Sequence, residues 1–260
     1  MSRRSAHKAV LAPVRLAAAA LALTGTWPAR AQISTWDFSS MLATNQELAS
    51  SACLAGRCGA SPPARRGAAP RPSVAATAIG RPVPRGAPQV PLRYTPSPAV
   101  HQQVLGDLIG RIRAKNPRDA EAIQAVFAKN DYGTLYDGIA GPYGLSGNDA
   151  GNAMTAYLIL GWLIANGRQD VPAGRAAALA ARAQIAGALA ESGAPRETWA
   201  ALGEELKLQF VIAHAGWLSA MREGHALPYA DGVARQFQQV YGIDLRRTAL
   251  DAGGLHRPGS

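Results

Sequence analysis

The chain has 260 residues, of which 48% are hydrophobic, and a formal net charge of +10 at neutral pH. This length corresponds to roughly one or two domains. The positive charge lies mostly before residue 92, because residues 92–260 carry 16 basic and 15 acidic side chains. A nucleic-acid-binding surface needs clustered basic residues on the folded part. The charge distribution therefore excludes nucleic acid from the partners that we expect.

Residues 1–31 have the pattern of a secretory signal peptide. The basic pair Arg3-Arg4 precedes the apolar segment Leu16–Leu23, and Ala29-Arg30-Ala31 fits a small-x-small cleavage site. We expect cleavage after this motif and export to the periplasm or the extracellular space. The general secretory route and the twin-arginine route both stay open. No later apolar run approaches the ~20 residues that span a bilayer, so we expect no transmembrane segment after cleavage.

Residues 32–58 form an N-terminal segment with the only two cysteines, Cys53 and Cys58, in the sequence CLAGRC. An exported protein can keep a disulfide, and we expect these two residues to close a small loop. Further metal ligands are missing nearby, so we expect neither a metal site nor another cofactor. Residues 59–91 are rich in Pro, Ala and Arg, a composition that predicts a disordered linker.

Residues 92–256 form the predicted folded domain. Apolar side chains recur there every three or four positions, which is the period of amphipathic helices. Ser97 and Pro98 are typical of a helix start, and Gly242 is typical of a helix end. Helices are expected at about residues 95–116, 117–127, 148–166, 172–191, 195–223 and 229–241, with a short helix or turn at 134–140. The predicted fold class is all-α, a compact bundle of about six helices around a buried central helix.

The central helix is expected at Asn148–Asn166. Asn148 and Asp149 are good N-cap residues, and the run Met154–Ala165 is apolar on nearly every face. A helix of this kind lies inside a bundle or a membrane, and this one is too short to cross a bilayer. Small residues such as Gly161 would let neighbouring helices approach closely.

Several polar or aromatic side chains accompany these apolar helices and are candidates for a site. The simpler interpretation of Asn152 and Tyr157 is an internal hydrogen bond, because a buried polar group needs a partner. His214 fits a core or boundary position in the same way. The alternative interpretation is a ligand-binding pocket, whose candidate residues are Tyr143, Asn152, Tyr157, Trp162 and His214. Four charged residues of the long helix are expected to face water: Arg196, Glu204, Lys207 and Arg222.

Four stretches resemble an uncharacterised family of signal-bearing, mostly proteobacterial exported proteins, catalogued as a domain of unknown function. They are LRYTPSPAV at Leu92–Val100, PYGL at Pro142–Leu145, N-x3-A-Y-x4-W at Asn152–Trp162 and YGIDLRRTAL at Tyr241–Leu250. Members of that family often have Asp before the Ala-Tyr pair, where this chain has Thr155. The resemblance implies a helical, exported protein and brings no activity, cofactor or catalytic residue.

The sequence contains none of the common hydrolase, phosphate-binding or dinucleotide-binding motifs. Whether the chain is an enzyme stays undecided, and a non-catalytic function is favoured. The main hypothesis is an interaction or binding module of the bacterial envelope, whose partner and oligomeric state the sequence does not specify. The first alternative is a carrier of a small apolar ligand in a pocket between helices. The second is a cell-envelope hydrolase that would use Glu205 and His214, if these two side chains converged in a cleft.

Overall fold

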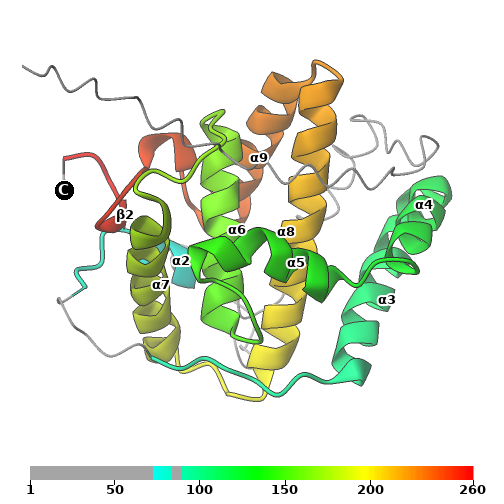
Figure 1. Ribbon diagram of the computed structural model, residues 1–260, viewed down its shortest axis with the longest axis horizontal. Coiled ribbons are helices and arrows are strands. Elements are labelled where there is room, and N and C mark those ends of the chain that lie inside the picture. Colours follow the sequence, from blue (N-terminus) through cyan, green and yellow to red (C-terminus); the bar gives the residue numbers. More distant parts are fainter. Residues whose placement is uncertain (1–72, 84–89, 260) are drawn as a thin grey trace, which may run out of the picture. The chain divides into compact units, whose positions relative to one another are not determined.

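The computed structural model describes residues 73–83 and 90–259, and these residues belong to one unit of the chain (Figure 1). Its α-helices are α2 (Val74–Ala78), α3 (Pro98–Lys115), α4 (Pro117–Phe127), α5 (Tyr132–Ala140), α6 (Ala150–Ala165), α7 (Gly174–Glu191), α8 (Thr198–Arg222) and α9 (Ala226–Tyr241). Two 3₁₀ helices, η1 (Gly141–Tyr143) and η2 (Leu245–Arg247), and a small hairpin of β1 (Ala249–Asp251) and β2 (Gly254–His256) complete the described part. The all-α prediction is confirmed.

Helix α6 is the centre of the bundle, as predicted. Every one of its residues is buried except Asn152 and Leu163, which are half-buried. Helices α7, α8 and α9 all pack against it, and α5 and α3 pack in turn against α8 (Figure 1). Asp149 is its N-cap and accepts a hydrogen bond from the backbone N–H of Asn152 at 2.9 Å. No helix in the described ranges is long and apolar enough to cross a membrane.

Local sequence signals account for several helix ends. Ser97 caps α3 through a bond from the N–H of Val100, with Pro98 as the first helical residue. Asn116 caps α4 in the same way. Helix α9 ends at Gly242, whose φ of 69° lies in the left-handed region that glycine adopts without strain. These caps satisfy backbone groups that a helix leaves unpaired.

Close packing around α6 depends on small residues. A Cβ atom on Gly161 would lie 2.5 Å from Cζ of Phe237 on α9, a distance that real Cβ contacts do not reach. The expected role of Gly161 in helix approach is therefore confirmed. Gly203 has the same role on α8, where an added Cβ would lie 2.4 Å from the ring of Tyr94.

The predicted disordered linker at 59–91 was wrong for residues 73–83, which are folded. Helix α2 packs against α7 and buries Val74, Ala75 and Ala78. The hydroxyl of Ser73 donates a hydrogen bond to the carbonyl oxygen of Tyr241 at 2.6 Å. The predicted signal peptide, the Cys53–Cys58 disulfide and the rest of the linker lie outside the described residues, apart from residues 90 and 91.

Candidate functional site

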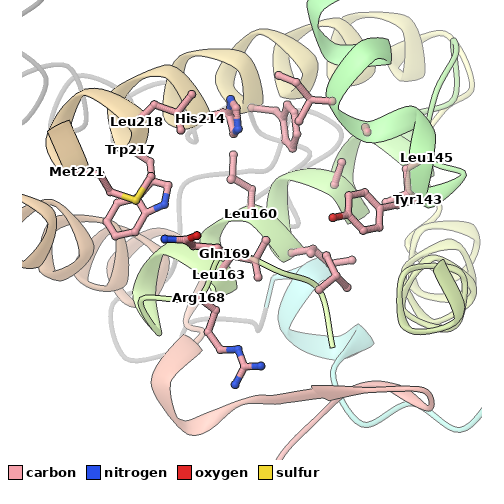
Figure 2. Close-up of a pocket in the computed structure, with 16 residues that line it drawn as sticks. Tyr143, Leu145, Leu160, Leu163, Arg168, Gln169, His214, Trp217, Leu218 and Met221 are labelled. Carbon is pink, nitrogen blue, oxygen red and sulfur yellow. The ribbon is translucent and has the colours of Figure 1, made fainter. Parts of the chain in front are cut away.

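A cavity of about 260 Å³ lies between α6 and α8 (Figure 2). Helix α6 contributes Ala156, Ile159, Leu160 and Leu163, which share one helical face at i, i+3, i+4 and i+7. Helix α8 faces them. The residues that line the cavity are Ile139, Ala140, Tyr143, Leu145, Ala156, Ile159, Leu160, Leu163, Arg168, Gln169, Val171, Phe210, His214, Trp217, Leu218 and Met221.

The wall of the cavity is mostly apolar, and its rim is partly open. Leu218 is 42% exposed, which is unusual for a large aliphatic side chain of this chain. The α8 residues that face α6 recur at helical spacing from Phe210 to Met221, so the apolar face of α8 continues along the whole cavity. This geometry matches the usual composition of small-molecule sites, which have apolar walls and a few polar groups.

His214 and Tyr143 supply polar groups to this cavity. Figure 2 shows the Tyr143 hydroxyl and the His214 ring directed to the space between the helices. The His214 ring stacks on Phe210 with a centroid distance of 6.3 Å, and burial lowers its pKa below the ordinary value. The imidazole is therefore neutral at pH 7. Neither His214 nor Tyr143 makes a side-chain hydrogen bond within the described part of the chain.

Of the other predicted site residues, Asn152 is placed away from the cavity. Its side-chain oxygen accepts a bond from Nε of Arg182 at 3.0 Å, and its amide nitrogen donates to the carbonyl of Ser146 at 2.8 Å. Arg182 is itself buried and forms an ion pair with Asp149 at 2.9 Å. The simpler interpretation of Asn152, an internal hydrogen bond, is the one that its contacts fit.

Tyr157 and Trp162 also point away from the cavity. The Tyr157 hydroxyl lies 3.5 Å from the amide nitrogen of Gln236, and its ring packs 5.2 Å from that of Phe237 on α9. Trp162 donates from Nε1 to the carbonyl of Thr248 at 2.7 Å. Of the five predicted site residues, Tyr143 and His214 therefore line the cavity, whereas Asn152, Tyr157 and Trp162 have internal contacts elsewhere.

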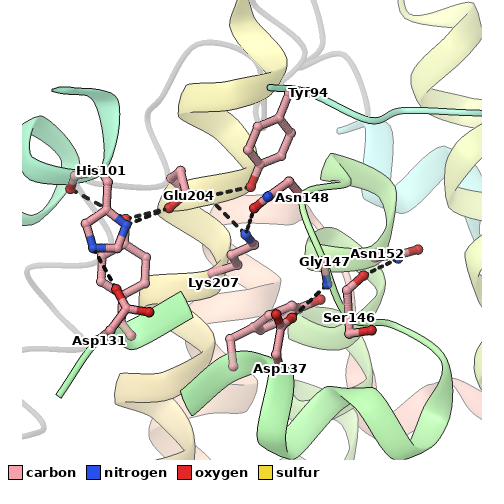
Figure 3. Close-up of polar contacts among 12 residues, drawn as sticks. Tyr94, His101, Asp131, Asp137, Ser146, Gly147, Asn148, Asn152, Glu204 and Lys207 are labelled. Atoms are coloured by element: carbon pink, nitrogen blue, oxygen red, sulfur yellow. Dashed lines mark hydrogen bonds and ion pairs between the residues drawn. The ribbon is translucent and has the colours of Figure 1, made fainter. Parts of the chain in front are cut away.

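A buried polar cluster on α8 was not predicted (Figure 3). We expected Glu204 and Lys207 to face water, and this was wrong, because they are only 5% and 3% exposed. One carboxylate oxygen of Glu204 accepts bonds from Tyr94 at 2.6 Å and Lys207 at 3.0 Å. The other accepts one from Tyr132 at 2.8 Å and lies 3.0 Å from Nδ1 of His101. Helices α3 and α5 and the segment before α3 cover this face of α8.

The cluster extends to both sides of Glu204. Nε2 of His101 lies 3.2 Å from a carboxylate oxygen of Asp131, and Lys207 donates to the side-chain oxygen of Asn148 at 2.6 Å. The rings of His101 and Tyr132 stack with centroids 4.0 Å apart. The sequence shows the members of this cluster only as isolated polar residues. They are as much as 110 positions apart, so no local motif identifies them as a cluster.

The electrostatics of the cluster favour an ionised Glu204. Burial alone would raise the pKa of its carboxyl, and it is the largest single effect. Tyr94, Lys207 and Tyr132 donate hydrogen bonds to the ionised carboxylate, and the positive charge of Lys207 attracts it. Together these interactions outweigh the effect of burial and lower the pKa of Glu204. Burial and the nearby carboxylate raise the pKa values of Tyr94 and Tyr132 far above the ordinary range. The four contacts to Glu204 occupy the acceptor positions of its carboxylate, and they link α8 to α3, to α5 and to the segment before α3.

The Glu205–His214 pair of the hydrolase hypothesis does not converge. Nine positions separate the two residues on α8, which corresponds to about two and a half turns and a rise of about 13 Å. Their side chains therefore leave opposite faces of the helix. Within the described residues no group of three or more His, Cys, Asp or Glu could hold a metal ion.

No family model, no curated protein and no solved structure matches this chain. The resemblance of residues 92–256 to an uncharacterised exported family stays a prediction. The function is therefore argued from the geometry of the site.

Proposed function

We propose that this chain is an exported, non-catalytic binding module that carries a small apolar ligand in the cavity between α6 and α8. The observation that carries the proposal is the cavity itself, which has about 260 Å³ of space and an apolar wall. Small-molecule sites are concave and mostly apolar, with a few polar groups, so this partly open space between two helices is a candidate for an occupant. Apolar cavities of comparable size bind benzene-like molecules.

Export is the second part of the proposal, and it rests on the sequence of residues 1–31. When the protein is produced with its own N-terminus in a bacterial host, we expect the periplasmic product to begin at Gln32. We also expect an intact mass two hydrogens lower without reductant, from a Cys53–Cys58 disulfide. Recovery of the chain in the cytoplasm with Met1 retained would contradict the export proposal. An envelope partner remains part of this proposal, and capture from the periplasm tests it.

The carrier proposal is tested with p-xylene, a neutral apolar probe that fits the cavity. Calorimetric titration of the purified protein is expected to give a dissociation constant of roughly 0.1–1 mM, given the small number of atoms in the probe. Ala156 is buried on the cavity wall, so Ala156→Leu fills the space and is expected to abolish this binding.

Ala176→Leu is the matched control, because Ala176 is an exposed residue of α7 outside the cavity lining. It adds the same atoms and is expected to leave p-xylene binding unchanged. Binding that survives Ala156→Leu, or is absent from the unaltered protein, refutes the proposal that this cavity is the ligand site. Far-UV circular dichroism of both variants verifies that the helices are intact.

A further inference from the structure

We infer that His101 forms a pH-sensitive contact, which holds α3 against both α5 and α8 only while the imidazole ring carries two protons. His101 lies near the start of α3 and is not part of the cavity between α6 and α8, so the inference is independent of the carrier function. Figure 3 shows its ring between the carboxylates of Asp131 and Glu204. The proposed export would place the chain where it meets the pH of its surroundings.

The two ring nitrogens of His101 both face carboxylate oxygens. Nδ1 lies 3.0 Å from an oxygen of Glu204, and Nε2 lies 3.2 Å from an oxygen of Asp131. An ionised carboxylate only accepts hydrogen bonds, and a neutral imidazole has one N–H and one lone pair. A neutral ring therefore donates to only one of these carboxylates. The imidazolium, with two N–H groups, is the form that satisfies both contacts.

The groups around the ring are set so that a histidine is the one that changes charge near neutral pH. Glu204 stays ionised, because its pKa is lowered by bonds from Tyr94 and Tyr132 and by the nearby Lys207. Both tyrosines stay neutral, because burial and the carboxylate raise their pKa values far above the ordinary range. Histidine is the side chain type that ordinarily changes charge between pH 5 and pH 8.

Loss of one proton separates α3 from α5 and leaves the contact with α8. The carboxylate of Glu204 is only 7% exposed and needs its donors, so the neutral ring keeps the proton on Nδ1. The lone pair of Nε2 then faces the carboxylate of Asp131, and the two repel. Asp131 is 53% exposed, so its carboxylate can be hydrated instead. It stays attached to α5, since it accepts bonds from the N–H and the hydroxyl of Thr134.

The contact controls how firmly α3 and α4 are held to the bundle. Helix α4 packs against α3, and Figure 1 shows these two helices together at one edge of the described part. The chain returns from α4 to α5 through residues 128–131. The contact between His101 and Asp131 therefore joins the end of this connection to the start of α3. Its loss favours local opening of α3 and α4, and hydrogen exchange of backbone amides detects such openings.

The direction of the pH effect follows from the protonated form. The contact contributes to stability while His101 carries two protons, and the contribution is lost as pH rises through the titration of this ring. NMR of the ring nitrogens in the ¹⁵N-labelled protein counts the protons directly. We expect two on His101 at pH 5.5 and one at pH 8.5. The same number at both pH values would overturn the inference.

Hydrogen exchange of the same protein measures the opening. After correction for the intrinsic effect of pH, amides of α3 are expected to exchange about three- to fivefold faster at pH 8.5 than at pH 5.5, the effect of one partly exposed ion pair. Amides of α6 are the internal reference and are expected to show no such change.

Two variants assign this difference to the contact. Asp131→Asn keeps an oxygen that can cap α5 and removes the charge, and His101→Gln removes the titrating ring. Each is expected to abolish most of the pH dependence of exchange in α3. His225→Gln is the matched control, because His225 is exposed at the start of α9, and it is expected to keep the full difference.

The remaining outcomes decide against the inference. Exchange of α3 that is equal at both pH values in the unaltered protein would mean that the contact has no effect on opening. The full difference in Asp131→Asn and His101→Gln would mean that another group titrates, as would its loss in His225→Gln. If His101→Gln fails to fold, Asp131→Asn still decides the question.

Discussion

Replacing Glu204 by Gln tests whether the buried cluster on α8 stabilises the fold. The change keeps the size of the side chain and removes its charge, so the ammonium of Lys207 keeps only neutral partners such as Asn148. Lys207 is 3% exposed and cannot turn to water without unpacking. Removing one member of a buried ion pair costs about 3–5 kcal/mol, a large share of the ~5–15 kcal/mol that stabilises a typical domain.

Urea unfolding followed by far-UV circular dichroism measures this loss. With a slope of about 2 kcal/mol per molar urea, Glu204→Gln is expected to lower the midpoint by about 2 M at neutral pH. Glu197 is exposed at the start of α8, so Glu197→Gln makes the same charge change on the surface. That control is expected to shift stability by no more than about 0.5 kcal/mol. Equal midpoints for the two variants would refute the argument that the pair is stabilising.

The same variant has a defined pH dependence. The folded-state pKa of Glu204 is lowered, so its contribution to stability is present above the pKa of a glutamate in the unfolded chain. That contribution is lost as pH falls through the lower folded-state pKa. The difference between the unaltered protein and Glu204→Gln should therefore shrink on acidification. A difference that grows on acidification would contradict an ionised Glu204.

Two further predictions concern packing and capping around α6. Gly161→Ala should destabilise the protein by about 1–3 kcal/mol, because the added methyl group meets the Phe237 ring. Gly110→Ala is the control on the exposed face of α3, where nothing meets the methyl group. It should stabilise the protein by about 0.5–1 kcal/mol. Equal thermal midpoints for these variants would contradict the packing argument. Asp149→Asn keeps a capping oxygen at the start of α6 but removes the negative charge beside the buried Arg182. Urea unfolding should show a decrease of about 3 kcal/mol in the free energy of unfolding. An unchanged midpoint would mean that only the capping hydrogen bond contributes to stability.

The fold could be predicted largely from local patterns. Asp149, Ser97 and Gly242 mark helix ends through bonds within a few residues of themselves, so neighbouring sequence is enough to recognise them. Helix α2 could not be recognised in this way. Its five residues are too few to form a stable helix alone, and they are helical because Val74 and Ala78 pack against α7.

The burial of Glu204 and Lys207 was hidden for a related reason. A Glu and a Lys three positions apart on a helix are typical of a solvated surface. What covers them here comes from distant residues, among them Tyr94 and His101, which reach Glu204 across 110 and 103 positions. The pattern of residues within one helix does not predict which of its polar faces a distant segment will cover. The charged residues without such cover, Arg196 and Arg222, are exposed as expected.

The sequence identified two residues that line the cavity but did not predict which way the other candidate side chains point. Tyr143 and His214 line the cavity, whereas Tyr157 and Trp162 lie on other faces of α6 and are taken up by contacts with Phe237 and Thr248. Helix α6 is apolar on nearly every face, so its sequence does not indicate which side chains point to the cavity and which point to other helices. The neighbours of α6 decide them.

The cavity between α6 and α8 is open at its rim, where Leu218 is exposed. Water can therefore occupy it, and the energetic penalty of an empty buried cavity does not apply. One larger side chain at Ala156 would narrow the space, and cavity-filling substitutions of this kind commonly stabilise a protein. The carrier proposal therefore depends on whether this apolar space holds a ligand, and Ala156→Leu tests it directly because the added side chain lies on the cavity wall.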